Sequence, residues 1–212
     1  MLSMPTIPGY RGPMSEQTEQ RRYHHGGLYA ALLEAAERSL RERGAEQLSL
    51  RDLAREVGVS HGAPRRHFAE RKDLLDALAE SGFRRLGEAI RHAVADGDAD
   101  FASRVRRATS AFANFARENP ALLELMNATK HQPEKAGVRL SAEKAFEPLV
   151  DLIHEGQDSG ILQAGPHEKI GIILYATING LANLANSGLV DAEQLDELTE
   201  AAVDQFLKGN AP

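Results

Sequence analysis

The sequence predicts an all-α protein built from a small N-terminal domain and a larger C-terminal one. Apolar residues recur at helical spacing from Leu28 onward, and no segment alternates as a strand would. Capping residues and glycines separate the periodic segments. We expect about nine helices. Three belong to a helix-turn-helix domain over residues 21–71, and the others to a larger helical domain over residues 72–208.

Composition excludes several kinds of protein. The 212 residues contain no cysteine, which excludes disulfides and thiolate metal sites and fits a reducing cytoplasm. No apolar run approaches the roughly 18 residues of a membrane span, and residues 1–20 lack a secretory signal. Because these 20 residues are rich in Pro and Gly, we expect a disordered arm there, and Met14 is an alternative to Met1 as the start.

The net charge of −6 is unevenly distributed along the chain. Residues 1–72 hold 12 Lys and Arg against 9 Asp and Glu, a net charge of +3. Residues 73–212 hold the other 13 and 22, a net charge of −9. A basic end on an acidic body indicates a surface that faces a polyanion, although scattered surface charge can give the same imbalance.

Residues 28–68 carry the signals of three consecutive helices. Ser49 is a predicted N-cap for the second helix, with an acidic residue three positions later as in a capping box. Gly58 ends this helix, and Ser60 is expected to cap a third one that has Pro64 in its first turn. The apolar faces of the first two helices comprise Leu28, Leu32, Ala35, Ala36 and Leu40, and then Leu50, Leu53, Ala54 and Val57.

Six further helices are expected after residue 71. A long fourth helix follows "RKD", with apolar residues or glycine at positions 75, 78, 82, 86 and 90. The other five are expected at about residues 101–117, 120–126, 138–154, 167–186 and 192–207.

The second and third helices, with the tight turn at Gly58, predict a helix-turn-helix. In such units the second helix enters the major groove, so most of its surface must offer donors to phosphates and bases. Ala63 and Phe68 supply a thin apolar edge, and Gly62 keeps the start of the helix slim. The side chains left for DNA are those of His61, Arg65, Arg66 and His67. Spacing alone leaves a second interpretation open, in which this charged helix is a solvated face that never meets DNA.

Residues 21–79 resemble the N-terminal domain of TetR-family transcriptional regulators. The resemblance includes a hydrophobic first helix ending in Gly, the segment "LSLRDLAREVGVS", the segment "GAPRRHF", and a basic residue three positions after Phe68. It implies that the protein binds operator DNA as a homodimer and is released by a small ligand in the C-terminal domain. The arm residues Arg21, Arg22, Tyr23, His24 and His25 could track a phosphate or the minor groove, or fold on the first helix.

The resemblance also implies roles for individual residues. Ser49 and Arg51 match positions that hold phosphates, and Arg71, beside Lys72, stands where the family generally has Lys. The position of Arg65 is usually Tyr, a phosphate contact, whereas Arg can also reach a guanine edge with two hydrogen bonds. The full predicted DNA-binding set is Ser49, Arg51, Ser60, His61, Gly62, Arg65, Arg66, His67, Arg71 and Lys72.

The C-terminal half resembles the family more weakly. The segment "YATINGLANLANSG" is similar to a subgroup whose penultimate helix carries a Trp and a His-Gly pair, with Tyr175 and Asn179-Gly180 in those places here. The family implies a dimer interface formed by the last two helices. Two apolar stripes suit that role, although a monomer core would show the same stripes: Ile170, Ile173, Leu174, Ile178, Leu181, Leu195, Leu198, Ala202 and Phe206.

A pocket for a small apolar or aromatic effector is expected between the fourth and eighth helices. Its predicted walls are Phe112, Phe115, Met126, Phe146, Leu149 and Ile153, with polar contacts from Asn127, His131, His154, Tyr175 or Asn179. Each of these residues, taken singly, is more typical of core or surface than of a ligand contact. No metal or cofactor is expected, since His61 and His67 would lie about 240° apart on a helix and no nucleotide-binding or hydrolase motif is present.

Together these patterns predict a cytoplasmic, ligand-released repressor that binds a palindromic operator as a homodimer and is not an enzyme. The fourth helix is the expected lever, because it should link the pocket wall to the DNA-binding unit. Two alternatives remain. One is a helical small-molecule-binding protein or enzyme whose N-terminal unit does not bind DNA, and the other is a regulator that activates or has no functional pocket.

Overall fold

The computed structural model describes residues 16–95, 99–129 and 135–212, with side chains from residue 27 onward. Within these ranges the chain is all helical, with eight α-helices and no strand. Two 3-10 turns, Ala45–Gln47 and Pro64–Arg66, lie in the N-terminal part. The helices are α1 (Glu16–Arg43), α2 (Leu50–Val57), α3 (Arg71–Val94), α4 (Phe101–Glu118), α5 (Pro120–Thr129), α6 (Ala136–Asp158), α7 (His167–Asn186) and α8 (Ala192–Gly209).

Local hydrogen bonds explain where α2 begins and ends. The Asp52 amide donates to Ser49 Oγ at 3.4 Å, which caps the helix as the sequence predicts. Gly58 adopts a φ of 76° directly after the helix, and the Val59 amide donates to the Ala54 carbonyl at 2.9 Å. This left-handed turn satisfies the last carbonyls of α2 and redirects the chain. The first helix and the tight turn of the predicted helix-turn-helix are therefore present.

The third helix is shorter than predicted. The sequence favours a helix over residues 60–68, but the structure has only the 3-10 turn at Pro64–Arg66. Ser60 does not cap it, because the residue before the turn is Ala63 and no side chain caps it. Glycine and proline close together in so short a segment weaken an α-helix, since one adds backbone entropy and the other removes an amide donor.

α1 begins further upstream than expected. It starts at Glu16, inside the segment predicted to be a disordered arm, and continues to Arg43. The predicted arm residues 21–25 belong to this helix, but their side chains lie outside the described part of the chain. Residues 1–15 also lie outside it, so the possible DNA contacts of the arm stay predictions.

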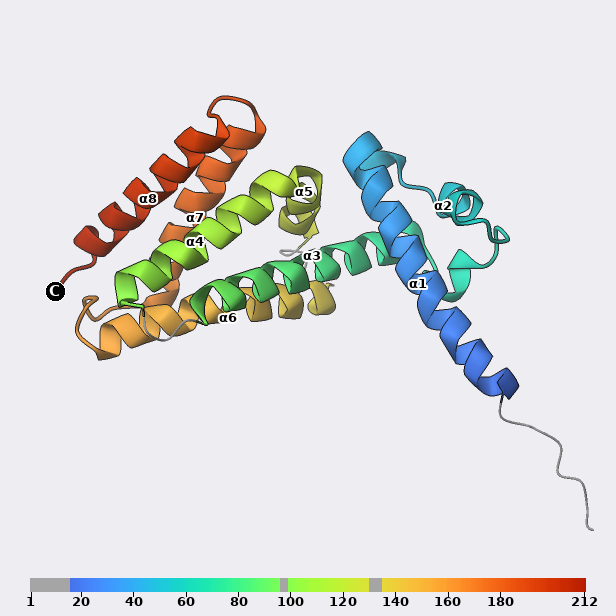
Figure 1. Ribbon diagram of the computed structural model, residues 1–212, viewed down its shortest axis with the longest axis horizontal. Coiled ribbons are helices and arrows are strands. Elements are labelled where there is room, and N and C mark those ends of the chain that lie inside the picture. Colours follow the sequence, from blue (N-terminus) through green and yellow to red (C-terminus); the bar gives the residue numbers. More distant parts are fainter. Residues whose placement is uncertain (1–15, 96–98, 130–134) are drawn as a thin grey trace, which may run out of the picture.

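α3 is the axis of the molecule (Figure 1). It begins in the N-terminal unit and runs between α4 and α6 through the C-terminal domain. Leu78, Gly82, Leu86 and Ile90 are buried along it, which confirms four of the five positions predicted from helical spacing. α3 and α6 approach closely at Gly87, where an added Cβ would lie 2.9 Å from Ala145 Cα. One buried apolar cluster consequently extends through both parts of the chain.

α4 packs against α3, α7 and α8, and the last two helices lie side by side (Figure 1). Asp100 caps α4 by accepting from the Ser103 amide at 2.9 Å. Asp191 does the same for α8, accepting from the Gln194 amide at 2.9 Å. In the described part of the chain, no helix combines the length and the apolar character needed to cross a bilayer.

Replacing Gly58 by alanine is expected to destabilise the protein by about 1–2 kcal/mol. A Cβ at this position would meet no other atom within 4 Å, so the loss should come from the positive φ alone. The measurement is the free energy of unfolding in urea. Gly62→Ala is the matched control, because Gly62 has equally open space without a positive φ. Equal losses in the two variants would contradict this explanation.

Candidate functional site

The segment after Gly58 is anchored to the N-terminal unit by two buried residues, Pro64 and Phe68. The Phe68 ring stacks on that of Tyr29 in α1, with 5.3 Å between centroids, and its amide donates to the Pro64 carbonyl at 2.9 Å. The half-buried His67 ring meets Tyr29 edge-on at 5.9 Å. The apolar edge is therefore formed by Phe68, as predicted, and by Pro64 more than by Ala63, which is half-buried.

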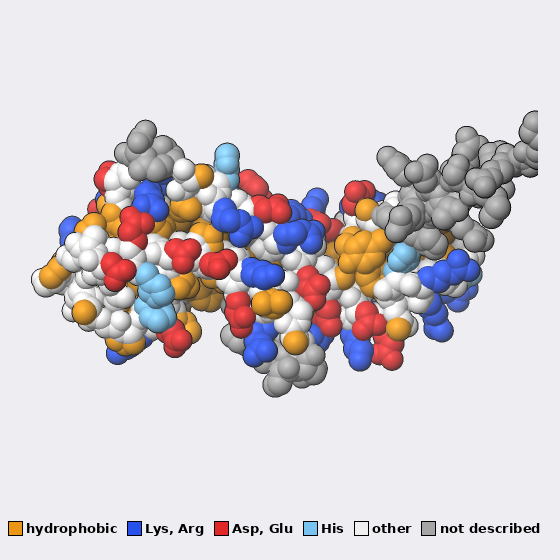
Figure 2. Space-filling model, turned by 90° about the horizontal axis from the view of Figure 1, so that it is seen from below, with side chains coloured by type: hydrophobic (Ala, Val, Ile, Leu, Met, Phe, Trp, Pro, Cys, Tyr) orange, Lys and Arg blue, Asp and Glu red, His pale blue; other side chains and the backbone are white. Residues whose placement is uncertain are grey.

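The residues between and before these anchors face solvent. Arg65, Arg66 and His61 are exposed, as are the predicted contacts Ser60 and Gly62. Among the described residues, neither Arg65 nor Arg66 makes a side-chain hydrogen bond or ion pair. Figure 2 shows Lys and Arg side chains gathered at this end of the molecule. Guanidinium groups with no acidic partner retain their donors for phosphate oxygens or base edges.

Other arginines of the same unit are already neutralised. Arg55 lies 2.9 Å from the Asp52 carboxylate, and Arg38 lies 2.9 Å from that of Glu56. Arg51 is exposed at the start of α2. Ser49 is half-buried, and its Oγ accepts the bond that caps the helix, so its hydroxyl hydrogen is still able to be donated to a phosphate.

Arg71 has a structural role that the sequence did not indicate. Its Nε donates to the Leu48 carbonyl at 3.0 Å, and its Nη2 donates to the Ala45 carbonyl. These bonds fasten the start of α3 to the loop between α1 and α2. The neighbouring Lys72 is exposed, with Nζ 3.7 Å from a Glu70 carboxylate oxygen. Phosphate contacts by Arg71 and Lys72 stay predictions.

A cavity of about 580 Å³ lies between α4, α6 and α7. The rings of Phe112, Phe146 and Tyr175 contact one another in its wall, with centroids 5.2 to 6.1 Å apart. The volume falls in the range of small-molecule sites, and an aromatic wall suits an apolar ligand. Charged and polar groups also border the cavity: Arg139, Glu143, His167 and Glu168.

Five of the eleven residues predicted for the pocket line this cavity. They are Phe112, Phe146, Ile153 and Tyr175, together with the predicted wall residue Leu149. Sequence analysis missed several others, although each lies three or four residues before a predicted aromatic and so shares its helical face. These missed residues are Thr109, Ala142, Gly171 and Ile172.

Five other predicted residues are not part of the cavity lining: Phe115, Met126, Asn127, His154 and Asn179. Phe115 lies beneath the guanidinium of Arg85, 5.8 Å from its ring centroid. Met126 is fully buried against α3, and His154 is exposed, with its ring 4.3 Å from that of His167. His131 lies outside the described residues.

Tyr175 connects the cavity to a short polar chain. Its hydroxyl donates to Asn127 Oδ1 at 2.8 Å, and Asn127 Nδ2 donates to Asn179 Oδ1 at 3.3 Å. Burial raises the pKa of Tyr175 to about 12. The phenol therefore stays protonated and remains a hydrogen-bond donor at neutral pH.

Titration of the tyrosines by phenolate absorbance is expected to lose its step near pH 12 when Tyr175 is replaced by phenylalanine. Because the folded pKa exceeds the value of about 10 for an unfolded tyrosine, the stability due to the neutral phenol is complete below about pH 10 and falls as the pH rises toward 12. A Tyr29→Phe control should retain the late step. A late step that persists in Tyr175→Phe would contradict the assignment.

The fourth helix, expected to link the pocket wall to the DNA-binding unit, contributes no residue to the cavity lining. That helix is α3, and the cavity lining comes from α4, α6 and α7. Within the described residues α3 supports the wall from behind, through the Phe83 ring, which meets the Phe146 ring at 6.5 Å edge-on.

The two apolar stripes of the last helices serve partly as protomer core. Ile170, Leu174, Ile178, Leu195 and Phe206 are buried within the chain, and Leu181 and Ala202 are half-buried. Only Ile173 and Leu198 of the predicted set are exposed, at 55 % and 39 %. They belong to a separate exposed face, which we call the α7/α8 face, made of Ile173, Ala176, Gly180, Leu184, Leu198 and Ala201.

Comparisons with known proteins agree with this architecture. The family model "Bacterial regulatory proteins, tetR family" matches residues 32–78, and "Tetracyclin repressor-like, C-terminal domain" matches residues 105–206. Together these two matches span most of the chain. No protein with a curated description matches the sequence significantly.

Several solved structures are similar over nearly their whole length. A protein with unknown function from Rhodococcus sp. RHA1 is 40% identical, with 90% of this chain and 98% of that chain covered and a TM-score of 0.82. A putative tetR family transcription regulator from Shewanella sp. PV-4 is 21% identical, with 87% and 98% covered and a TM-score of 0.71. The TetR family transcriptional regulator PfmR from Thermus thermophilus is 22% identical, with 84% and 97% covered and a TM-score of 0.66. With its helix-turn-helix unit and its helical C-terminal domain, the chain belongs to the TetR family of transcriptional regulators.

Proposed function

We propose that the protein is a cytoplasmic repressor that binds a palindromic operator as a homodimer and is released by a small apolar or aromatic ligand. The main support for DNA binding is the exposure of basic side chains in the segment from His61 to His67. Its anchors are buried, whereas Arg65 and Arg66 are exposed and make no ion pair among the described residues. Two unneutralised guanidinium groups on a segment that follows a helix-turn suit phosphates and base edges.

Ligand control rests on the cavity between α4, α6 and α7. Its aromatic wall and its volume of about 580 Å³ suit a ligand of moderate size, and Tyr175 offers one oriented hydroxyl. Dimerisation rests on the α7/α8 face, since residues 170–186 contain no charged side chain although several of them are exposed. An uncharged, partly apolar face of this kind is typical of a protein interface.

A mobility-shift assay with the DNA upstream of the protein's own gene tests the proposal. The affinity should fall steeply as salt rises, because each phosphate contact releases counterions. A random duplex of equal length is the control for specificity. Binding that is absent, or that ignores both salt and sequence, would refute a regulatory role and favour a helical small-molecule-binding protein or enzyme.

A further inference from the structure

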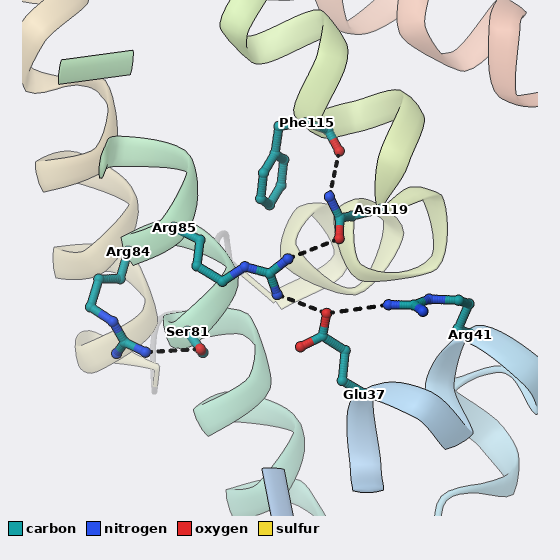
Figure 3. Close-up of polar contacts among 7 residues, drawn as sticks. All are labelled: Glu37, Arg41, Ser81, Arg84, Arg85, Phe115 and Asn119. Atoms are coloured by element: carbon teal, nitrogen blue, oxygen red, sulfur yellow. Dashed lines mark hydrogen bonds and ion pairs between the residues drawn. The ribbon is translucent and has the colours of Figure 1, made fainter. Parts of the chain in front are cut away.

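A polar cluster joins the DNA-binding unit to the regulatory domain (Figure 3). Arg85, on α3, donates from Nη1 to Glu37 Oε1 at 2.7 Å and from Nη2 to Asn119 Oδ1 at 3.0 Å. Glu37 belongs to α1, and Asn119 is the residue between α4 and α5. Arg41 adds a second cation 3.6 Å from the same Glu37 oxygen. We call Glu37, Arg41, Arg85 and Asn119 the interdomain clamp.

The clamp is held firmly on its regulatory side. Asn119 is only 8 % exposed, and its Nδ2 donates to the Phe115 carbonyl at 2.9 Å. The Arg85 guanidinium also lies over the Phe115 ring, 5.8 Å from its centroid. A planar guanidinium can hold two partners in fixed directions, which a lysine ammonium does less well. Arg85 therefore fixes the position of α1 relative to the end of α4.

The joint around the clamp is not completely filled by side chains. A void of about 10 Å³ remains between α1 and the start of α5, bordered by Glu37, Arg41 and Asn119 and by apolar groups. Close-packed interiors resist displacement, whereas a polar joint with a void of about one water molecule can rearrange at lower cost.

Two helices connect the clamp to the cavity. α4 carries Thr109 and Phe112 in the cavity wall and, one turn further on, Phe115, which is followed by Asn119 at the end of the helix. α3 carries Phe83, whose ring meets the cavity residue Phe146, and Arg85 follows two residues later. A ligand that displaces Phe112 would move α4 directly, and a ligand that displaces Phe146 would press on Phe83 of α3. Each of these two helices holds one side of the clamp.

We propose that Arg85 is a positioning residue for DNA binding, through which the occupancy of the cavity sets the orientation of the DNA-binding unit. The inference rests on the proposed regulatory function and specifies how the cavity is coupled to the DNA-binding unit. A bound ligand displaces α4 or α3, and the hydrogen bond from Arg85 to Glu37 transmits this displacement to α1. A chain that lacks the clamp retains both domains, but its DNA-binding unit no longer responds to the cavity.

A tethered occupant tests this route without an identified ligand. Ala142 lines the cavity, and the chain has no cysteine, so Ala142→Cys provides a single thiol at the wall. Benzyl methanethiosulfonate transfers a benzylthio group to that thiol and releases methanesulfinate. In the otherwise native chain, the label should weaken binding to the upstream DNA by about tenfold, within the usual range of allosteric coupling. In an Arg85→Met background, labelled and unlabelled proteins should differ by less than about twofold.

Two further variants separate coupling from simple loss of structure. Arg84→Met is the matched control, since Arg84 is exposed and bonds to Ser81 of its own helix at 2.9 Å (Figure 3). It changes the charge equally and should keep the full tenfold response. Glu37→Met removes the acceptor on the α1 side and should abolish the response as Arg85→Met does.

Hydrogen exchange supplies a readout that requires no DNA. The label at position 142 should speed amide exchange in residues 37–43 and 119–129 of the native-clamp protein and leave it unchanged in Arg85→Met. An equal response to the label with and without Arg85, by affinity and by exchange, would overturn the inference, as would no response in either. Failure of every variant to bind DNA would count against the proposed function, whereas an Arg85-dependent exchange response would still support the clamp.

Discussion

Replacing Arg65 and Arg66 together by alanine is expected to weaken binding to the upstream DNA by roughly 100-fold. Both guanidinium groups are exposed and make no ion pair among the described residues, so the folded protein loses no polar contact of these side chains when they are removed. Each is able to hold a phosphate or a guanine edge with charge-assisted hydrogen bonds. The free energy of unfolding should therefore change by less than about 0.5 kcal/mol, as at other surface positions.

The salt dependence of the same double variant distinguishes the kinds of contact. Each lost phosphate contact should lower the slope of log affinity against log salt by about 1. A lost base contact should instead reduce the preference for the upstream DNA over a random duplex. Arg84→Ala with Arg91→Ala is the control, because it removes the same charge from exposed positions of the regulatory domain. If both double variants bind equally weakly, overall charge and not the 61–67 segment carries the affinity.

Placing glutamate at both Ile173 and Leu198 is expected to convert a dimer to monomers. Both side chains are exposed in the protomer, so its own core should stay intact. In a dimer formed through the α7/α8 face, each carboxylate would be buried without a partner, at a cost of several kcal/mol per charge. Dimerisation should weaken by roughly 1,000-fold or more. Binding to a palindromic operator should weaken with it, because each monomer reads one half-site.

Sedimentation velocity at micromolar protein, followed by the mobility-shift assay, measures this effect. Leu140→Glu with Ile161→Glu is the matched control, since both residues are similarly exposed but lie away from the α7/α8 face. The control should stay dimeric and bind DNA. A dimer that survives the change at Ile173 and Leu198 would place the interface elsewhere, whereas loss of helical signal would mean that the side chains support the protomer itself.

The helix order was predictable because it depends on local signals. Ser49, Gly58 and Asp191 determine helix ends through hydrogen bonds or backbone conformation within a few residues of themselves. Apolar spacing then identified the buried faces, as at Leu86 and Ile90. The segment Pro64–Arg66 forms a 3-10 turn and not the predicted α-helix. The spacing of apolar residues does not reveal this, because it carries no information on how many backbone amides are available to form helical hydrogen bonds.

The sites were harder to predict because they depend on which helices become neighbours. Phe112 and Phe115 lie one turn apart on α4, and both are buried, but Phe112 faces the cavity and Phe115 faces α3. Spacing alone cannot distinguish these two faces. The same holds for α7, where Leu174 belongs to the core and its neighbour Ile173 is exposed. Arg71 resembles a phosphate ligand in sequence, yet its bonds to the α1–α2 loop depend on a contact 23 residues away.

The uninterrupted run of α3 from Arg71 to Val94 has a consequence for protein engineering. A biosensor made by grafting this DNA-binding unit onto a foreign sensing domain would need its splice point inside that rod. Each inserted or deleted residue rotates the grafted head by about 100° and shifts it by about 1.5 Å. Chimeras whose helix lengths differ by whole helical turns should therefore all respond to the ligand of the sensing domain. Chimeras with intermediate lengths should fold but fail to respond.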